Sequence, residues 1–290
     1  MANAANTKLI NAISSSSIKN QLNQYLAVDS KLTFIETKQL LTNMAQGGMT
    51  VTELKDLNTM WSYRGTLFAD DYTNDITGYF INGCNSNAFW WGGVGQSGKS
   101  KLGNLSASMP QGNLENLVNK WFAGDDVPMA LVSGDTAAGI SGDFKYDYAI
   151  ISGSLFQNGP SALDVNQGQV GDCYFLSALG AVANANPSLI TNDFICDNGD
   201  GTYGVRFFNV NGEKYYVTVD RNLAVDQYKS PILAYPLNGE LWVALAEKAY
   251  AQMNSQVNVL NRATSDNCYK DIEGGWADPL QQITGLNFKY

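Results

Sequence analysis

The N-terminal part of the chain carries apolar residues with the spacing of short α-helices. Between residues 7 and 62 they recur every three or four positions, which places them on one face of each helix. One helix is predicted over residues 37–46, where a Gly-Gly pair ends it, and Thr50 with Glu53 has the spacing of a capping box that begins the next helix. A further helix is predicted over residues 113–122. Packing in a small helical bundle explains these stripes, so we assign them no chemistry.

Further along the chain, the period of the pattern changes. Residues 173–185 predict a helix that is apolar nearly all round. Residues 203–219 instead alternate around an Asn-Gly pair, as in a β-hairpin. Residues 240–254 predict another helix, which leaves Glu247 and Lys248 exposed or at the border of its apolar face.

Gly, Ser and Asp dominate residues 133–143, which favours a boundary between two parts of the chain at this point. Residues 144–151 predict a strand that ends the first part. We therefore expect an α+β chain with two domains. A mostly helical N-terminal accessory module occupies residues 1–152, and a domain built from a buried helix and an antiparallel hairpin occupies residues 153–290.

Composition and charge argue against several classes of partner. The chain has 27 Asp and Glu against 18 Lys and Arg, and this net charge of −9 disfavours binding to nucleic acid or to an anionic membrane surface. No apolar run is long enough to span a membrane, and the N-terminus lacks the basic and apolar regions of a standard signal peptide. Abundant uncharged polar residues are typical of bacterial extracellular or surface proteins. Localisation therefore stays open between export by another route and the cytoplasm.

Residues 93–100, GVGQSGKS, match the GxxxxGK[ST] pattern of a phosphate-binding P-loop. A P-loop needs a buried strand before it and a long helix after it, so that backbone N–H groups and the helix dipole meet the phosphates. Here Gly103, Pro110 and Gly112 interrupt any following helix, and only a short NAFWW run precedes the motif. We interpret the motif as a flexible loop, and P-loop nucleotide binding is the remote alternative function.

Cys173 is the candidate nucleophile because it stands at the start of the predicted apolar helix. Unpaired backbone N–H groups and the positive end of the helix dipole favour a thiolate at such a position. The side-chain amide of Gln167, six residues earlier, can fold back and form an oxyanion hole with the Cys173 backbone N–H. Gly168 and Gly171 allow the sharp turn that this requires. By position alone, a single Cys in an apolar helix is more often an inert small hydrophobe.

The chain contains no histidine. A catalytic cysteine nucleophile needs an imidazole to take the thiol proton and later to protonate the leaving group. The four cysteines have no CxxC spacing, so they predict neither a zinc site nor a disulfide framework. Cys173 is therefore not part of a complete Cys-His-Asn site within these residues.

The segment QGQVGDCYFLSAL, which contains Gln167 and Cys173, resembles the active-site segment of the calpain family of papain-like cysteine proteases, usually QGxxGDCWfLaal. WVALAEKAYAQMN, from residue 242, and IEGGWADPLQQITG, from residue 272, resemble later segments of the same family in the same order. The resemblance covers about residues 155–290. Before it, the stretch from Trp91 to Pro128 is similar to a pattern that precedes calpain-like domains in some bacterial proteins.

The resemblance implies that residues 153–290 are the first, Cys-bearing lobe of a calpain-type endopeptidase core that acts on proteins or peptides. In this comparison Gln167 is the oxyanion residue, Cys173 is the nucleophile, and Tyr174 replaces the usual Trp with another large aromatic. The GHAY-type His and NPWG-type Asn motifs of the family's second lobe are not present.

The catalytic core is thus expected to be incomplete, to be inactive alone, and to have a His-bearing second lobe as its partner. Three explanations remain open: truncation, processing into two chains, or a pseudoprotease lobe that has become a protein-binding module.

Calcium is the one cofactor that the resemblance raises. Gly159 and Asp164 match calcium-ligand positions of the family by their offset from the Cys. The acidic ligand usually found shortly before the Trp of WsALLEKAY has no clear match near Leu237, which argues against a calcium requirement.

Overall fold

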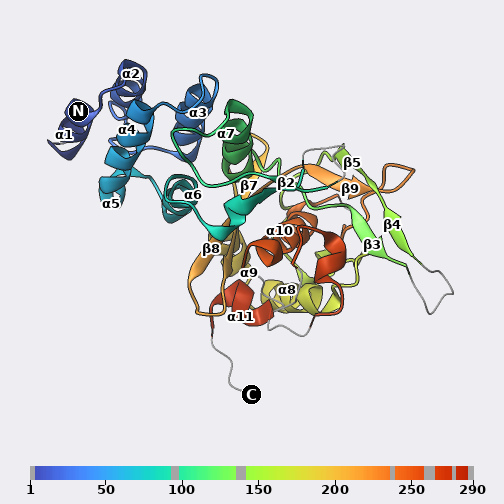
Figure 1. The fold of residues 1–290 in the computed structure, drawn as a ribbon. Coiled ribbons are helices and arrows are strands. Elements are labelled where there is room, and N and C mark those ends of the chain that lie inside the picture. The colour runs from blue at the N-terminus through green and yellow to red at the C-terminus, as the bar shows by residue number, and fades with distance from the viewer. Residues whose placement is uncertain are drawn as a thin grey trace. The chain divides into compact units, whose positions relative to one another are not determined.

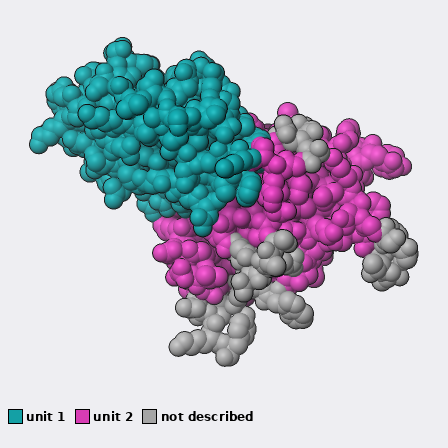
Figure 2. Space-filling model, in the orientation of Figure 1, with its two compact units in different colours: residues 1–90, 101–123 teal, residues 91–100, 124–290 magenta. Residues whose placement is uncertain are grey.

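The computed structural model of the chain describes residues 4–92, 98–134, 142–235, 239–257, 265–275 and 279–286. The chain divides into two compact units, coloured separately in Figure 2. Unit 1 comprises residues 1–90 and 101–123, and unit 2 comprises residues 91–100 and 124–290. Helices make up most of unit 1, whereas unit 2 combines helices with antiparallel strands, so the α+β class with a helical N-terminal part is confirmed.

Unit 1 is a set of short helices whose apolar faces pack against one another. The buried side chains of these helices are large and apolar, for example Leu22, Leu40, Phe80 and Phe122. The elements are α1 (Ala4–Ala12), α2 (Ser16–Tyr25), α3 (Phe34–Ala45), α4 (Val51–Ser62), α5 (Arg64–Leu67), α6 (Asp71–Ile81), η1 (Asn85–Ala88), β1 (Phe89–Trp90), α7 (Gln111–Val118) and the π-helical turn η2 (Asn119–Ala123). Strand β2 (Ser100–Lys101) has one residue in each unit.

Capping boxes begin two of these helices. The predicted capping box of α4 is confirmed, because Thr50 accepts from the backbone N–H of Glu53 while the Glu53 side chain accepts from that of Thr50. Helix α3 has the same arrangement between Thr33 and Glu36. The helix predicted over residues 37–46 therefore starts three residues earlier than expected, at Phe34, because Thr33 supplies the cap.

Unit 2 contains a three-stranded antiparallel sheet of order β6-β7-β8 and two separate strand pairs, β3-β4 and β5-β9, and helix α10 packs against β7, β8 and β9 (Figure 1). Among the described residues, none of the helices is long and apolar enough to cross a membrane. The elements are β3 (Leu131–Ser133), β4 (Asp143–Lys145), β5 (Asp147–Ile150), η4 (Ala162–Asp164), α8 (Cys173–Ala185), α9 (Pro187–Leu189), η5 (Ile190–Phe194), β6 (Ile195–Asp197), β7 (Thr202–Phe208), β8 (Lys214–Asp220), β9 (Asn222–Val225), α10 (Trp242–Val257), η6 (Tyr269–Ile272) and α11 (Pro279–Thr284).

The predicted hairpin is confirmed by the register of β7 and β8. Its apolar residues lie opposite one another, in the pairs Tyr203–Val219, Val205–Val217 and Phe207–Tyr215. All six side chains are buried, because alternate residues of a strand point to the same face of the sheet.

Helix α10 lies at the centre of unit 2. Every residue from Trp242 to Asn254 is buried, including Glu247 and Lys248, whose side chains are fully inaccessible. The prediction that these two charged residues are exposed or at a border was wrong. Each has polar partners from distant segments: Glu247 accepts from the Ala234 backbone N–H, and Lys248 contacts Asp220. Such partners offset the cost of burying charged groups.

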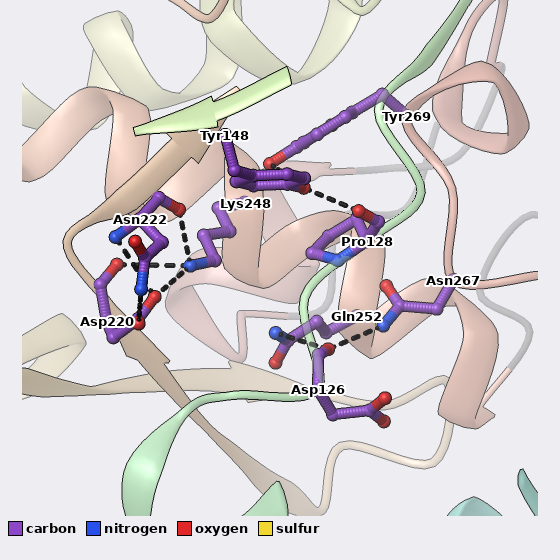
Figure 3. Close-up of polar contacts among 9 residues, drawn as sticks. All are labelled: Asp126, Pro128, Tyr148, Asp220, Asn222, Lys248, Gln252, Asn267 and Tyr269. Atoms are coloured by element: carbon purple, nitrogen blue, oxygen red, sulfur yellow. Dashed lines mark hydrogen bonds and ion pairs between the residues drawn. The ribbon is translucent and has the colours of Figure 1, made fainter. Parts of the chain in front are cut away.

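Hydrogen bonds and an ion pair connect α10 to distant segments of unit 2 (Figure 3). The Lys248 ammonium donates to the Asp220 carboxylate and to the Asn222 backbone oxygen, the latter over 2.7 Å. Burial lowers the pKa of Lys248, and the Asp220 charge opposes that shift. Further along the helix, Gln252 donates to the Asp126 carbonyl over 3.1 Å, as Asn267 does over 2.8 Å.

Residues 124–152 are built into unit 2 by similar contacts. The Tyr148 hydroxyl of β5 donates to the Pro128 carbonyl, and β5 pairs antiparallel with β9 along its whole length. Gly124 has a left-handed φ of 72°, and a Cβ there would lie 2.6 Å from the Val219 carbonyl carbon, so only glycine fits without displacement. The predicted boundary between residues 152 and 153 therefore falls inside unit 2.

Candidate active site

Helix α8 places Cys173 at its first position, where the side chain is exposed. The Asp172 carbonyl accepts from the Phe175 N–H over 2.8 Å and from the Leu176 N–H over 3.2 Å, which starts the helix. The amide of Cys173 precedes these intrahelical donors, so the thiol lies beside the unpaired N–H groups and positive dipole of a helix N-terminus. Burial of Phe175 and Leu176 holds this end of the helix in place.

The exposed side of α8 differs from the prediction of burial nearly all round. Cys173, Ser177, Ala181 and Asn184 are exposed and recur at helical spacing, so they form one stripe along the helix. Their small or polar side chains leave little apolar surface in water. The remaining faces carry the buried residues expected from the sequence.

Gln167 lies in the loop of residues 165–172, here called the Gln167 loop. Its side-chain Nε2 donates to the Val170 carbonyl over 2.9 Å. The amide thus folds back toward Val170, which precedes Cys173 by three residues. An amide nitrogen carries two hydrogens, and this bond uses one of them. Both candidate residues thus lie on one short loop–helix junction.

The Gln167 loop is held by residues 231–235, here called the 231–235 segment. The Gln169 N–H donates to the Ile232 carbonyl over 2.7 Å, and the Tyr235 N–H donates to the Asn166 carbonyl over 3.1 Å. These two bonds flank Gln167. A Cβ on Gly168 would lie 2.0 Å from the Ile232 oxygen, so glycine is required by this close backbone approach.

A second segment, residues 272–275, borders the junction from the other side. The Gly274 N–H donates to the Gly171 carbonyl over 2.9 Å, and the Tyr174 hydroxyl donates to the Ile272 carbonyl over 2.8 Å. A Cβ on Gly275 would lie 2.3 Å from the Tyr174 ring. Tyr174 is thus hydrogen-bonded through its hydroxyl group, and its ring leaves room only for a glycine at position 275.

Two buried carboxyl groups near the junction were not predicted. Asp172 and Glu247 are both fully inaccessible, and neither Asp172 oxygen has a hydrogen-bond partner among the described residues. Burial, together with the nearby charge of Glu273, raises the pKa of Asp172 to about 8. Burial and the charge of Asp172 raise the pKa of Glu247 well above its usual value. The sequence signal for Glu247 is its place beside the apolar stripe of its helix, where the periodicity alone predicts an exposed or border position.

One of the two calcium candidates, Asp164, already has hydrogen-bond partners within the chain. One Asp164 carboxylate oxygen accepts from the Ser161 N–H over 2.7 Å and from the Trp242 indole over 3.1 Å, and the residue is 7% exposed. In the part of the chain that the structure describes, no group of three or more acidic, His or Cys side chains is arranged to hold a metal. A calcium site at Gly159 and Asp164 stays a prediction from the sequence, and Leu237 lies outside the described residues.

The P-loop-like motif lies mostly outside the described residues, since residues 93–97 are among those not described. Its lysine, Lys99, is described. Lys99 forms an ion pair with Asp266 at 3.0 Å and lies 4.7 Å from the centre of the Trp91 ring. These contacts give the lysine structural partners within unit 2.

Comparison with known proteins shows which protein family the segment around this junction resembles. The sequence profile of the calpain family cysteine proteases matches residues 147–287. Residues 147–287 belong to the calpain family. The calpain-family segment begins at β5 and includes Cys173, Gln167 and the 231–235 segment.

Individual relatives match the same part of the chain. A calpain-type cysteine protease, ADL1, from Oryza sativa subsp. japonica is 34% identical over 130 residues, which is 43% of this chain and 6% of that protein. Calpain-5 of Mus musculus is 29% identical over 140 residues, covering 45% of this chain and 22% of that protein. A thiol protease of Porphyromonas gingivalis is 34% identical over 133 residues, covering 42% of this chain and 27% of that protein. The chain thus spans little more than a quarter, or less, of these relatives.

Proposed function

We propose that the calpain-family segment supplies the nucleophile and the oxyanion hole of a cysteine endopeptidase. Cys173 attacks the carbonyl carbon of a peptide bond, and the Gln167 side-chain amide with the Cys173 backbone N–H stabilises the negative oxygen of the tetrahedral intermediate. The observation that supports this most is the exposed Cys173 thiol at the N-terminus of a buried helix, with Gln167 folded back on the loop before it.

The proton transfers of this reaction need a group that these residues lack. Because the chain contains no histidine, we propose that the imidazole comes from a His-bearing second lobe outside residues 1–290. The exposed stripe of Cys173, Ser177 and Ala181 on α8 offers that lobe a surface of small side chains next to the thiol. The thioester formed by Cys173 would then be hydrolysed with the help of that histidine.

The nucleophile can be tested on this chain with iodoacetamide at neutral pH. Cys196 is the matched control because its side chain is also exposed, whereas burial raises the pKa of Cys268 to about 11 and slows its reaction. We expect Cys173 to be alkylated faster than Cys196, since the helix N-terminus stabilises a negative sulfur. Labelling rates measured by mass spectrometry would contradict the proposal if Cys173 reacted at the rate of Cys196 or more slowly.

Peptidase activity separates the proposal from the alternative of a protein-binding module. The 290-residue chain alone is expected to cleave no unfolded casein, with or without calcium. The complete gene product should cleave it, with activity abolished by Cys173→Ala and reduced on the order of 100- to 1,000-fold by Gln167→Ala. A complete gene product that binds but never cleaves unfolded protein would favour the binding module, for which the lack of histidine is the supporting observation.

A further inference from the structure

We propose that Glu247 is a positioning residue for the oxyanion hole, which it holds through the 231–235 segment. Glu247 does not touch the reacting atoms. It fixes the 231–235 segment, and that segment fixes the loop that carries Gln167. This inference rests on the proposed function, because it assigns Glu247 a part in the same reaction.

The first link joins α10 to the 231–235 segment. The Glu247 Oε2 atom accepts from the Ala234 N–H over 2.6 Å, and both residues are fully buried. The helix around Glu247 is packed on all sides, so the carboxyl group has little freedom to move. The Ile232 N–H also donates to the Ala224 carbonyl of β9 over 3.0 Å, so the segment is bound both to the helix and to a strand.

The second link joins the 231–235 segment to the Gln167 loop. Hydrogen bonds from Gln169 to Ile232 and from Tyr235 to Asn166 lie on either side of Gln167, and the Asn166 side chain adds a bond to the Tyr235 carbonyl over 3.3 Å. The space between Gly168 and the Ile232 oxygen is too small for a methyl group. A shift of the 231–235 segment must therefore move Gln167, and oxyanion stabilisation depends on donor position to within a fraction of an ångström.

The protonation state of Glu247 indicates which substitution should preserve this role. Burial and the neighbouring Asp172 both raise the pKa of Glu247, which favours its neutral, protonated form. Tyr250 and Tyr269 also have their pKa values raised, by burial and by the charges around them, so they remain neutral neighbours. Glutamine has the size of a neutral glutamic acid and an oxygen that can accept from Ala234. Glu247→Gln should therefore retain the contact, and Glu247→Leu should lose it while filling the same volume.

The test compares two reactions of the Cys173 thiol, of which only one places a former carbonyl oxygen in the oxyanion hole. With N-acetyl-alanyl-alaninal, the sulfur forms a bond to the aldehyde carbon, the carbonyl π bond breaks, and its oxygen takes the thiol proton to give a hemithioacetal. The hole stabilises that oxygen. With iodoacetamide, the sulfur displaces iodide and the hole has no part. Neither product needs a histidine to form, so both reactions can be measured on this chain, which has none.

We expect Glu247→Leu to weaken the aldehyde affinity about 10- to 100-fold, as Gln167→Ala should, while the iodoacetamide rate at Cys173 changes less than about twofold. Glu247→Gln should stay near the wild-type affinity. Gln252→Leu is the matched control, because Gln252 is a buried polar residue of the same helix that contacts the Asp126 carbonyl instead. Its aldehyde affinity should remain that of the wild type.

The outcomes separate this inference from the proposed function. If the aldehyde binds in a manner that depends on Cys173 and Gln167 but Glu247→Leu has no effect, the positioning role is wrong and the proposed function stands. If the aldehyde does not bind the wild type, or binds Cys173→Ala equally well, both fail. If Glu247→Leu does not fold, Glu247→Asp decides, since its shorter side chain must shift the Ala234 contact. Unchanged affinity in that variant would overturn the inference.

Discussion

The side chain of Asp172 lies fully buried immediately before the proposed nucleophile. It does not cap α8, although it occupies the N-cap position. Its pKa is raised from 3.8 to about 8 because burial disfavours the charged form. A protonated, neutral Asp172 adds no negative charge beside the sulfur, which suits a site that has to stabilise a thiolate.

This shift predicts how stability depends on pH. Between about pH 4 and pH 8 the folded protein holds a proton that the unfolded chain releases. The free energy of unfolding should therefore fall as pH rises through this window, by up to about 1.4 kcal/mol per pH unit, and level off on either side. Asp172→Asn removes this contribution. Between pH 5 and pH 8, the free energy of unfolding should therefore fall by about 2–4 kcal/mol less in the variant than in the wild type.

Urea unfolding at a series of pH values would measure the difference. Asp147→Asn is a suitable control, because the Asp147 side chain in the same unit is 84% exposed. That variant should follow the pH dependence of the wild type. Parallel curves for Asp172→Asn and the wild type would show that Asp172 is ionised in the folded protein.

Among the elements of unit 1, α4 illustrates how a local sequence signal starts a helix. Thr50 and Glu53 satisfy each other's backbone N–H groups, and these bonds involve residues only three positions apart. Thr50→Ala removes the side-chain acceptor and leaves the Glu53 N–H without it. We expect a loss of about 1 kcal/mol in the local stability of α4, measured by amide hydrogen exchange on the whole chain.

Thr52→Ala provides the matched change inside the same helix. Thr52 is exposed within α4, and alanine has the higher helix propensity, so this variant should leave α4 unchanged or slightly more stable. Equal protection of α4 in Thr50→Ala and Thr52→Ala would contradict a stabilising role for the capping box.

In unit 2 as a whole, the contact between Lys248 and Asp220 joins α10 to the turn between β8 and β9. The Lys248 side chain is inaccessible and that of Asp220 is 12% exposed, so removal of one partner leaves a charge in a poorly solvated place. Lys248→Met should lower the free energy of unfolding by about 3–5 kcal/mol. Adding Asp220→Asn should recover part of the loss, because the remaining group is then neutral.

The pair of Lys270 and Asp143 is the control for that prediction. Its ion pair is 2.8 Å long, but the two side chains are 42% and 41% exposed. Water solvates both charges when the pair is broken, so Lys270→Met should change stability little. Denaturant unfolding of both methionine variants would test the contrast. A Lys248→Met protein as stable as Lys270→Met would mean that the buried network adds nothing to unit 2.

The sequence by itself determined the features that depend on neighbours along the chain. The alternation of residues 203–219 predicted both strands of the hairpin, Thr50 and Glu53 predicted a helix start, and the apolar run from Cys173 predicted α8. Gln167 and Cys173, six residues apart in a recognisable motif, also needed no tertiary information to be singled out as candidates. In each case the physical cause lies within one turn or one hairpin.

Only the tertiary structure decided which groups are buried by distant segments. Glu247 and Lys248 have an ordinary place at the edge of a helical stripe, and their burial depends on Ala234 and Asp220, which lie 13 and 28 residues away. Gly168 and Gly275 are required by the close approach of the Ile232 oxygen and the Tyr174 ring, which no local pattern records. Burial and close packing are set by segments that meet in space, so sequence periodicity alone could not assign them.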